Sequence, residues 1–279
     1  MSKRPAHPLI FTDLDGTLLD HESYSAKPAD LLIEQINRDS IGSVVPITSK
    51  TRAELKLLQE KVPLKATISV TENGSVIHIP QDHPFEAGTG PQDIVSGRGY
   101  TEILEQIDAL PPVLRQQIRG FADMSAAEVS NATGLGLQEA LLAKQRDASA
   151  PFLWSGSDAA LQELEQIMAD ADIRIQRGGR FYHFTGDANK AQAMARIKAG
   201  FVDRQNGHSE LISIALGDGP NDLEMIESAD RGVIMPNPGG VSIHSSKSHV
   251  RVAPAPGPQG WVLAVRELFS ELGIILPES

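Results

Sequence analysis

Two aspartates separated by one residue follow a short apolar stretch near the start of the chain. The apolar residues 8–10 (PLI) lead into residues 11–17 (FTDLDGT), which indicates a buried strand that ends in Asp13, Asp15 and a glycine turn. Because strand side chains alternate between faces, the i, i+2 spacing puts both carboxylates on the same side. One can attack a phosphorus atom while the other moves a proton, which is phosphoryl-transfer chemistry. Taken alone, the same residues could also form an ordinary acidic turn.

Four polar residues further along the chain complete what such a reaction requires. Hydrolysis through a carboxylate also needs a cation to shield the phosphate and donors to the transferring oxygens. Thr48 ends an apolar strand, Lys190 begins a helix, and Asp218 and Asp222 follow the apolar run 211–216. Each has an ordinary explanation by itself: a helix N-cap, a solvated lysine and a polar turn that caps a helix. Their shared position at element ends favours a single phosphate site.

In this order and spacing the segments resemble the motifs of the haloacid dehalogenase superfamily. The first is Asp-x-Asp-Gly-Thr, and the fourth is Gly-Asp-x-x-Asn-Asp, which residues 217–222 (GDGPND) match. The resemblance implies that Asp13 is the nucleophile and forms an aspartyl phosphate. It implies that Asp15 protonates the leaving alkoxide and later deprotonates the attacking water. It also implies that the Thr48 hydroxyl binds a phosphate oxygen, and that Lys190 neutralises the nucleophile and the phosphate.

The metal expected with this chemistry is Mg²⁺, a hard cation that prefers oxygen ligands and keeps several waters. Asp13, the backbone carbonyl of Asp15, and Asp218 are the expected protein ligands. Asp222 is expected to hold a metal-bound water. These four residues form the predicted metal site, and Mg²⁺ is the predicted cofactor.

Alternating apolar and amphipathic segments predict the elements that position these residues. Up to about residue 80 the pattern is βαβαβ, with strands at 9–12, 42–48 and 66–70 and helices at 28–38 and 51–60. This alternation predicts an α/β fold, doubly wound around a mainly parallel sheet, with its site at the carboxyl ends of the strands. The Asn73-Gly74 pair predicts a hairpin that returns along 75–79.

The pattern changes between about residues 81 and 186. Residues 81–91 are rich in Pro, Gly and Asp and predict a linker. Helices follow at 101–110, 126–131, 137–144 and 158–171, mixed with short strands at 117–121, 151–154, 173–176 and 180–184. This mixture predicts an inserted α+β domain with an antiparallel sheet.

The α/β pattern then resumes with a helix at 189–198 and a strand at 211–216. A linker-like stretch at 236–258 precedes an amphipathic helix at 261–272. We therefore predict a core made of residues 1–82 and 187–279, and a cap made of residues 83–186. A cap that closes over the site would exclude water and read the leaving group.

The position of the insert and residues 72–74 (ENG) resemble the branch of the superfamily with a large α+β cap. Within it, the segments most similar to the mannosyl-3-phosphoglycerate phosphatase family are 47–51 (ITSKT), 94–100 (IVSGRGY), 178–183 (GGRFYH) and 257–261 (GPQGW). Commoner sugar-phosphatase relatives carry Thr-Gly-Arg as the second motif, whereas this chain has Thr-Ser-Lys at 48–50. The resemblance implies Mg²⁺-dependent hydrolysis of mannosyl-3-phosphoglycerate to mannosylglycerate, in a compatible-solute route. Glucosyl-3-phosphoglycerate, broader sugar phosphates, a phosphomutase and a non-catalytic binding protein stay open as alternatives.

Such a substrate carries a phosphate, a carboxylate and a sugar, so cations are expected around it. Arg177 and Arg180 flank a Gly-Gly pair between two predicted cap strands and could present guanidinium groups to the carboxylate. Lys50 of the second motif and Lys144 are further candidates for substrate binding, and Arg98 is a weaker one. The alternative is a hairpin turn with solvated arginines.

Composition limits the possible partners. The chain has 279 residues, of which 41% are hydrophobic, enough for a large core and a second, smaller domain. It has no cysteine, which excludes disulfides and thiolate sites, and its net charge of −11 argues against nucleic acid as a partner. No apolar segment has the length of a signal peptide or a membrane span, which predicts a cytoplasmic protein without a membrane partner. The expected partner is a small phosphorylated sugar or glycerate, and the oligomeric state stays open.

Overall fold

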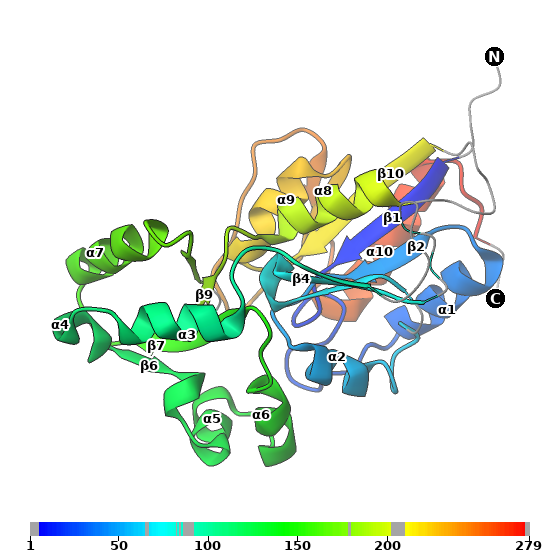
Figure 1. The fold of residues 1–279 in the computed structure, drawn as a ribbon. Coiled ribbons are helices and arrows are strands. Elements are labelled where there is room, and N and C mark those ends of the chain that lie inside the picture. The colour runs from blue at the N-terminus through cyan, green and yellow to red at the C-terminus, as the bar shows by residue number, and fades with distance from the viewer. Residues whose placement is uncertain are drawn as a thin grey trace.

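The computed structural model of the chain describes residues 6–64, 67–81, 83, 85, 92–177, 180–201 and 210–276. Figure 1 shows a larger part, built on a parallel sheet with helices on both faces, and a smaller part to its left that is built on an antiparallel sheet. The predicted fold class, an α/β core with an inserted α+β cap, is confirmed.

The central sheet brings the carboxyl ends of two distant strands together. Its order is β12-β11-β10-β1-β2, and all neighbours are parallel. The strands are β1 (Ala6–Thr12), β2 (Ser43–Pro46), β10 (Glu210–Gly217), β11 (Arg231–Ile234) and β12 (Val250–Val252). Thr12 is in register with Leu216, and the amide of Asp13 donates to the Leu216 carbonyl at 2.9 Å. Asp13 and Asp218, each directly after its strand, therefore lie side by side.

Two apolar clusters hold helices to opposite faces of this sheet. Ile10 of β1 packs in a cluster with α1 (Ala29–Asp39) and α10 (Gly257–Glu271), whereas Phe11 packs with α8 (Lys190–Gly200) and α9 (Leu223–Ser228). Figure 1 shows α8 and α9 in front of the sheet and α10 behind it. The alternation of neighbouring β1 residues between the two clusters is the period-two pattern of a strand buried on both sides.

The fully buried indole of Trp261 in α10 ties this helix to the functional end of β1. Its Nε1 donates to the Thr12 hydroxyl at 3.1 Å, and that hydroxyl donates to the carbonyl of Asp13 at 2.8 Å. The helix predicted at 261–272 begins four residues earlier in the structure, at Gly257. Trp261, in the second turn of α10, thus fixes the backbone next to the predicted nucleophile.

A second, antiparallel sheet extends from the edge of the core. It consists of β3 (Ser69–Thr71), β4 (Val76–Ile79) and β5 (Gln92–Val95), and β3 continues beside β2 through an Ile47–Val70 bridge. The predicted hairpin return along 75–79 is confirmed, but its turn is a 3₁₀ turn, η1 (Glu72–Gly74), and not a two-residue Asn-Gly turn. Glu72 and Asn73 in this turn have positive φ angles of 54° and 59°. Side chains that hold such a backbone in place are commonly part of a functional site.

The smaller part has a four-stranded antiparallel sheet of order β6-β7-β9-β8. Its strands are β6 (Ile118–Gly120), β7 (Ser149–Trp154), β8 (Arg174–Arg177) and β9 (Tyr182–Thr185). One apolar cluster joins this sheet to α3 (Tyr100–Asp108) and α7 (Asp158–Ala169). A second cluster, around Phe121 and Phe181, joins it to α5 (Ala126–Thr133) and α6 (Leu137–Ala143). A short helix, α4 (Pro112–Arg115), precedes β6.

The chain passes between the two parts at Gly97 and Gly186, which touch each other. A Cβ atom on Gly97 would lie 2.6 Å from the Cα of Gly186, and one on Gly186 would lie 2.5 Å from the amide nitrogen of Arg98. Only glycine allows this approach, and Gly97 also has a positive φ of 81°. The two passages therefore run in contact.

The structure corrects one predicted linker. The stretch 236–258 contains β12, which is the edge strand of the central sheet and pairs with β11 alone. Three residues are too few to show a strand period, so the Pro and Gly around them dominate the sequence pattern. The predicted linker at 81–91 lies largely outside the described residues. β5 falls inside the range 83–186 but pairs with β4, and the division into residues 1–82 with 187–279 and residues 83–186 stays a prediction.

Candidate active site

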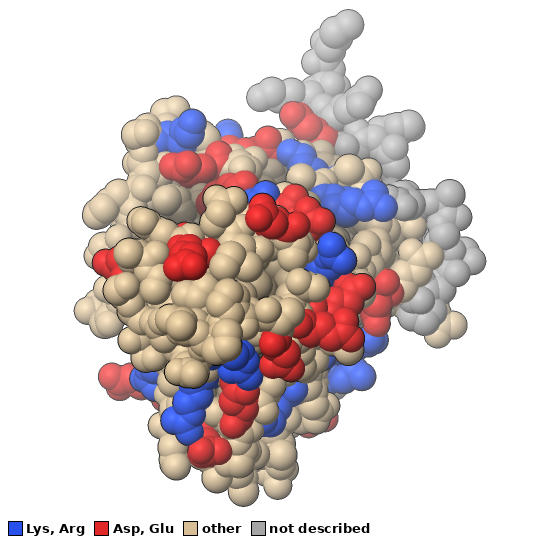
Figure 2. All heavy atoms as spheres, turned by 60° about the vertical axis from the view of Figure 1, so that its left-hand side comes forward, with Lys and Arg blue, Asp and Glu red and all other residues tan. Residues whose placement is uncertain are grey.

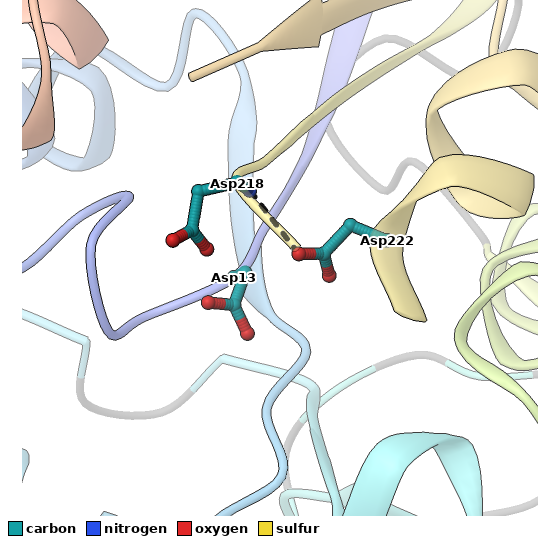
Figure 3. A group of neighbouring side chains, drawn as sticks. All are labelled: Asp13, Asp218 and Asp222. Atoms are coloured by element: carbon teal, nitrogen blue, oxygen red, sulfur yellow. Dashed lines mark hydrogen bonds between the residues drawn. The ribbon is translucent and has the colours of Figure 1, made fainter. Parts of the chain in front are cut away.

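Three carboxylates converge at the carboxyl edge of the central sheet (Figure 3). Asp13 follows β1, Asp218 follows β10, and Asp222 ends the 3₁₀ turn η3 (Pro220–Asp222) before α9. One oxygen from each lies within 4.8 Å of the others, and all three residues are buried. The dashed line in Figure 3 is the bond from the Asp218 amide to Oδ2 of Asp222, 3.2 Å long, and the Gly219 amide donates to the same oxygen at 2.9 Å. These bonds hold Asp222 in place.

Lys190, at the start of α8, is buried against this cluster. Its Nζ lies 2.5 Å from Oδ1 of Asp13 and 2.6 Å from Oδ1 of Asp222. Burial disfavours the ammonium ion, but the attraction of Asp13 and Asp222 outweighs this effect and raises the pKa of Lys190. The lysine is therefore charged and holds two of the three carboxylates.

One cation does not balance three carboxylates. Burial raises the pKa of Asp13 well above its usual value, although Lys190 opposes the shift. Burial, followed by repulsion from Asp222, raises the pKa of Asp218 to about 6. Both shifts show that this cluster disfavours its own negative charge. Closely spaced carboxylate oxygens with excess negative charge fit a hard divalent cation such as Mg²⁺.

The carboxylate of Asp15 forms an ion pair with Lys50 and not with Lys190. Its Oδ2 lies 2.8 Å from Nζ of Lys50, while its Oδ1 is buried with no hydrogen-bond partner in the described part of the chain. Burial disfavours the Lys50 ammonium, but Asp15 and Glu54 outweigh it and raise the pKa of Lys50. Gly16, the residue after Asp15, lies against the carboxylate cluster, since a Cβ there would lie 2.6 Å from Oδ2 of Asp218. The Asp15–Lys50 pair thus borders the carboxylate cluster.

Thr48 lies one strand away from Asp13 and is almost fully buried. Its amide donates to the carbonyl of Val70 at 3.0 Å, and its hydroxyl accepts from the amide of Lys50 at 3.1 Å. The alternative role of helix N-cap belongs instead to Thr51, which forms a capping box with Glu54 at the start of α2 (Arg52–Leu58). Thr48 therefore shapes the loop that carries Lys50.

A cavity of about 370 Å³ lies between the core and the smaller part. The core contributes the carboxylate cluster, Asp15 and Lys50 to its lining. The smaller part contributes cationic, aromatic and imidazole side chains: Arg146, Arg180, Phe181 and His183. Negative charge is thus concentrated on the core side of the cavity and positive charge on the opposite side. This polarity suits a phosphate ester that also carries a negative group on its leaving side.

Of the predicted cap cations, only Arg180 is among the described residues that line this cavity. Arg177 lies over the ring of Tyr182, 5.7 Å from its centre. Lys144 donates to the carbonyls of Phe121 and Met124, and Arg98 donates to the carbonyl of Ala171 at 3.2 Å. These three side chains, like Arg180, which donates to the carbonyl of Ala132, thus make contacts within their own part of the fold. The Gly-Gly pair at 178–179 lies outside the described residues.

The sequence did not identify Arg146, which reaches from the smaller part to the second motif. Its Nη1 donates to the carbonyl of Ser49 at 2.9 Å and to the Ser149 hydroxyl at 3.3 Å, and its Nε donates to the carbonyl of Ala143 at 2.9 Å. It lies between a helix and a strand, in no recognisable motif. The one signal in the sequence is its charge, because an anionic leaving group requires a cation in the cap.

Glu72 makes a second bond system between the two parts. Its carboxylate accepts from the amides of Asp147 and Ala148, at 2.7 and 3.1 Å, and from the Ser149 hydroxyl at 2.6 Å. The next residue, Asn73, accepts from the side chain of Asn221 at 3.0 Å. The η1 turn therefore connects β7 to the loop that carries Asp218 and Asp222.

Comparison with known proteins agrees with this geometry. Residues 143–241 match the haloacid dehalogenase-like hydrolase family. The chain is 32% identical over 277 residues to a glucosyl-3-phosphoglycerate/mannosyl-3-phosphoglycerate phosphatase of Persephonella marina, covering 95% of this chain and 98% of that protein. The chain belongs to this family of haloacid dehalogenase-like phosphatases. A phosphatase of the same name from Methanococcoides burtonii is also 32% identical, over 94% of this chain and 97% of that one.

The fold is similar to that of the sucrose-phosphatase from Synechocystis sp. PCC6803, solved with sucrose and phosphate. The TM-score is 0.61 and the identity 15%, over 98% of this chain and 99% of that chain. Family membership makes the chain a phosphoric monoester hydrolase of the sugar-phosphatase type, and phosphatases of this superfamily generally use Mg²⁺. Within the described residues, no helix has the length and apolar character to cross a membrane.

Proposed function

We propose that the chain hydrolyses mannosyl-3-phosphoglycerate to mannosylglycerate and phosphate, with Mg²⁺ as cofactor and Asp13 as nucleophile. The observation that carries this proposal is the polarity of the cavity. Asp13, paired with Lys190, lies on its core side, and Arg146 and Arg180 lie on the opposite side. A phosphate bound at Asp13 would direct a carboxylate-bearing leaving group toward these arginines, which bind carboxylates well.

In the first step an oxygen of Asp13 attacks phosphorus, and the bond from phosphorus to the glycerate oxygen breaks. Asp15 gives its proton to that leaving oxygen. In the second step Asp15 takes a proton from water, the water oxygen attacks phosphorus, and Asp13 is freed as inorganic phosphate forms. Lys190 supports the ionised state of Asp13 through its bond of 2.5 Å.

Asp13, the carbonyl of Asp15, and Asp218 would hold the metal, with Asp222 binding one of its waters. When bound, Mg²⁺ supplies positive charge to the phosphoryl oxygens. The cluster of buried carboxylates, with one lysine to balance three acids, supports this assignment. Thr48 would contribute its hydroxyl to a phosphate oxygen.

Glucosyl-3-phosphoglycerate is the second candidate substrate, because the relatives from Persephonella marina and Methanococcoides burtonii are named for both sugars. The sugars differ at one hydroxyl group. A broader sugar phosphatase would tolerate both and also simple sugar phosphates. A phosphomutase would transfer the phosphoryl group to another position of the sugar, and a binding protein would release no phosphate.

The test is phosphate release by the purified protein with Mg²⁺ from mannosyl-3-phosphoglycerate, glucosyl-3-phosphoglycerate and glucose 6-phosphate. We expect kcat/KM to be highest for mannosyl-3-phosphoglycerate and lowest for glucose 6-phosphate. Asp13→Asn should remove turnover while substrate still binds. In ¹⁸O-labelled water the label should appear in the released phosphate.

Equal kcat/KM for all three compounds would replace the proposal by a broad sugar phosphatase. Transfer of phosphate to a second position of the sugar, with no label in free phosphate, would indicate a mutase. If the protein released no phosphate from any of the three and Asp13→Asn bound them as well as the wild type, a binding role would be the conclusion.

A further inference from the structure

His183 is a buried imidazole on the cavity side of the β6–β9 sheet that the proposed mechanism does not use. It is 8% exposed and lines the cavity together with Arg146 and Phe181. Its strand neighbour Phe184 packs on the opposite face of the sheet, in the cluster with α3 and α7. The alternation of β9 therefore directs His183 toward the cavity and the core.

The ring lacks the hydrogen bond that a buried imidazole normally has. Its Nδ1 is buried with no partner in the described part of the chain. Across the sheet His183 pairs with Pro151 on one side and Gln176 on the other. Pro151 has no polar group in its side chain. The side-chain nitrogen of Gln176 donates to the Thr185 hydroxyl at 3.2 Å and to the carbonyl of Ala188 at 2.7 Å. An unpartnered polar group at a ligand cavity is what a bound ligand would satisfy.

The surroundings of the ring define which chemical group it can bind. Burial, together with the charges of Arg146 and Lys190, lowers the pKa of His183 to about 3. The ring is therefore neutral near pH 7 and offers one donor and one acceptor. A hydroxyl group is itself both donor and acceptor, so it can hydrogen-bond a neutral imidazole. The carboxylate and the phosphate of the substrate would instead bind the cations Lys50, Arg146 and Arg180.

We propose that His183 is a specificity-determining residue that hydrogen-bonds a sugar hydroxyl of the substrate in the cap half of the cavity. This inference rests on the proposed function and extends it to the sugar. Arg146 and Arg180 hold the charged part of the leaving group, and His183 recognises the glycosyl part. The phosphate end of the substrate does not contact the imidazole.

The test compares His183→Phe, which keeps a planar ring without nitrogen, with His183→Gln, which keeps a donor and an acceptor. For the proposed glycosylated substrates, kcat/KM of His183→Phe should fall about tenfold or more, which is the effect of losing one buried hydrogen bond. With p-nitrophenyl phosphate, which has no sugar, the loss should be less than about threefold. His183→Gln should recover part of the activity on glycosylated substrates.

His244→Phe is the matched control, because His244 is exposed and outside the lining of the cavity. Circular dichroism and thermal unfolding of each variant identify loss of fold. Equal losses on p-nitrophenyl phosphate and on glycosylated substrates, or no loss on either, would overturn the role of His183. Absence of turnover of glycosylated phosphoglycerates by the wild type would instead overturn the proposed function and this inference with it.

Discussion

Lys50 and Lys190 form ion pairs with different carboxylates of the site. Lys190 forms ion pairs with Asp13 and Asp222, whereas the described ion pair of Lys50 is with Asp15, at 2.8 Å. In the proposed mechanism the nucleophile Asp13 must be ionised and the proton carrier Asp15 must exchange its proton, so the two aspartates need separate electrostatic surroundings. The two lysines provide them.

Lys50→Met should lower kcat without a matching rise in KM. Removal of the ammonium leaves the Asp15 carboxylate without its partner, so its orientation toward the leaving oxygen is lost. We expect a fall of at least about tenfold, part of the 10²–10⁴-fold that a positioned acid–base group contributes. Steady-state kinetics with a glycosylated phosphoglycerate measure it, and Lys247→Met, at an exposed lysine, is the control. A rise in KM with constant kcat would mean that Lys50 binds substrate, as its place in the second motif suggests.

Among single residues, the sequence predicted those site residues that directly follow parallel strands. The carboxyl ends of β1 and β10 meet by topology, so Asp13 and Asp218 could be paired from the order of strands and helices along the chain. Arg146 and His183 reach the same cavity from the smaller part. Their positions depend on how that part packs on the core, and no local pattern encodes this packing.

The η1 turn is one of the elements that connect the two parts of the molecule. Glu72 adopts a positive φ, which is unfavourable for a side chain with a Cβ, and its carboxylate accepts three bonds from residues 147–149. Arg146 adds a bond in the opposite direction, to Ser49. The buried Glu72 carboxylate and Arg146 thus both hold the cap in position over the site.

Glu72→Gln should destabilise the protein by about 1–3 kcal/mol, because an amide NH₂ would face backbone N–H groups and leave donors unpaired. Urea unfolding measures the free energy of unfolding. Glu163→Gln, at an exposed position on α7, is the matched control and should change it by less than about 0.5 kcal/mol. An unchanged free energy in Glu72→Gln would mean that the bonds to residues 147–149 contribute nothing net.

Elements with a long periodic pattern were predicted well. The helices at 28–38 and 158–171 correspond to α1 and α7, and the apolar run 211–216 corresponds to β10. Short elements were missed, namely β5, β11, β12, α4 and α9. An element of three to six residues is fixed by the elements it packs or pairs with, and its sequence alone carries too little periodicity.

At the scale of the whole molecule, charge is distributed unevenly. The chain has a net charge of −11, and the face in Figure 2 shows basic and acidic side chains interspersed, with no extended basic area. The cations that matter for an anionic substrate are instead drawn together at the cavity: Lys50, Arg146 and Arg180. These cations place positive charge beside the acidic residues of the cavity and so reduce the repulsion of an anionic substrate there.

Mg²⁺ should raise the thermal unfolding temperature by several degrees, because its proposed ligands, Asp13, the carbonyl of Asp15 and Asp218, come together only in the folded chain. At a concentration 100-fold above Kd the gain is about 2.7 kcal/mol. EDTA should reverse it. Asp218→Asn should lose the Mg²⁺-dependent rise yet unfold at an equal or higher temperature without metal, since it removes repulsion with Asp222. Asp170→Asn, at an exposed position, should respond to Mg²⁺ like the wild type. A full Mg²⁺ response in Asp218→Asn would contradict the metal assignment.

The contact between Gly97 and Gly186 has a consequence for how this protein can change over generations. Because the excursion of the chain into the cap leaves and returns at one point, the segment between the two glycines can be exchanged without moving the strands that carry Asp13 and Asp218. An exchanged segment would have to preserve the two glycines and also the groups at 146–149 that bond to Ser49 and Glu72. The same core, with its carboxylate cluster, can thereby be combined with a different cap, and the enzyme can then recognise a different sugar.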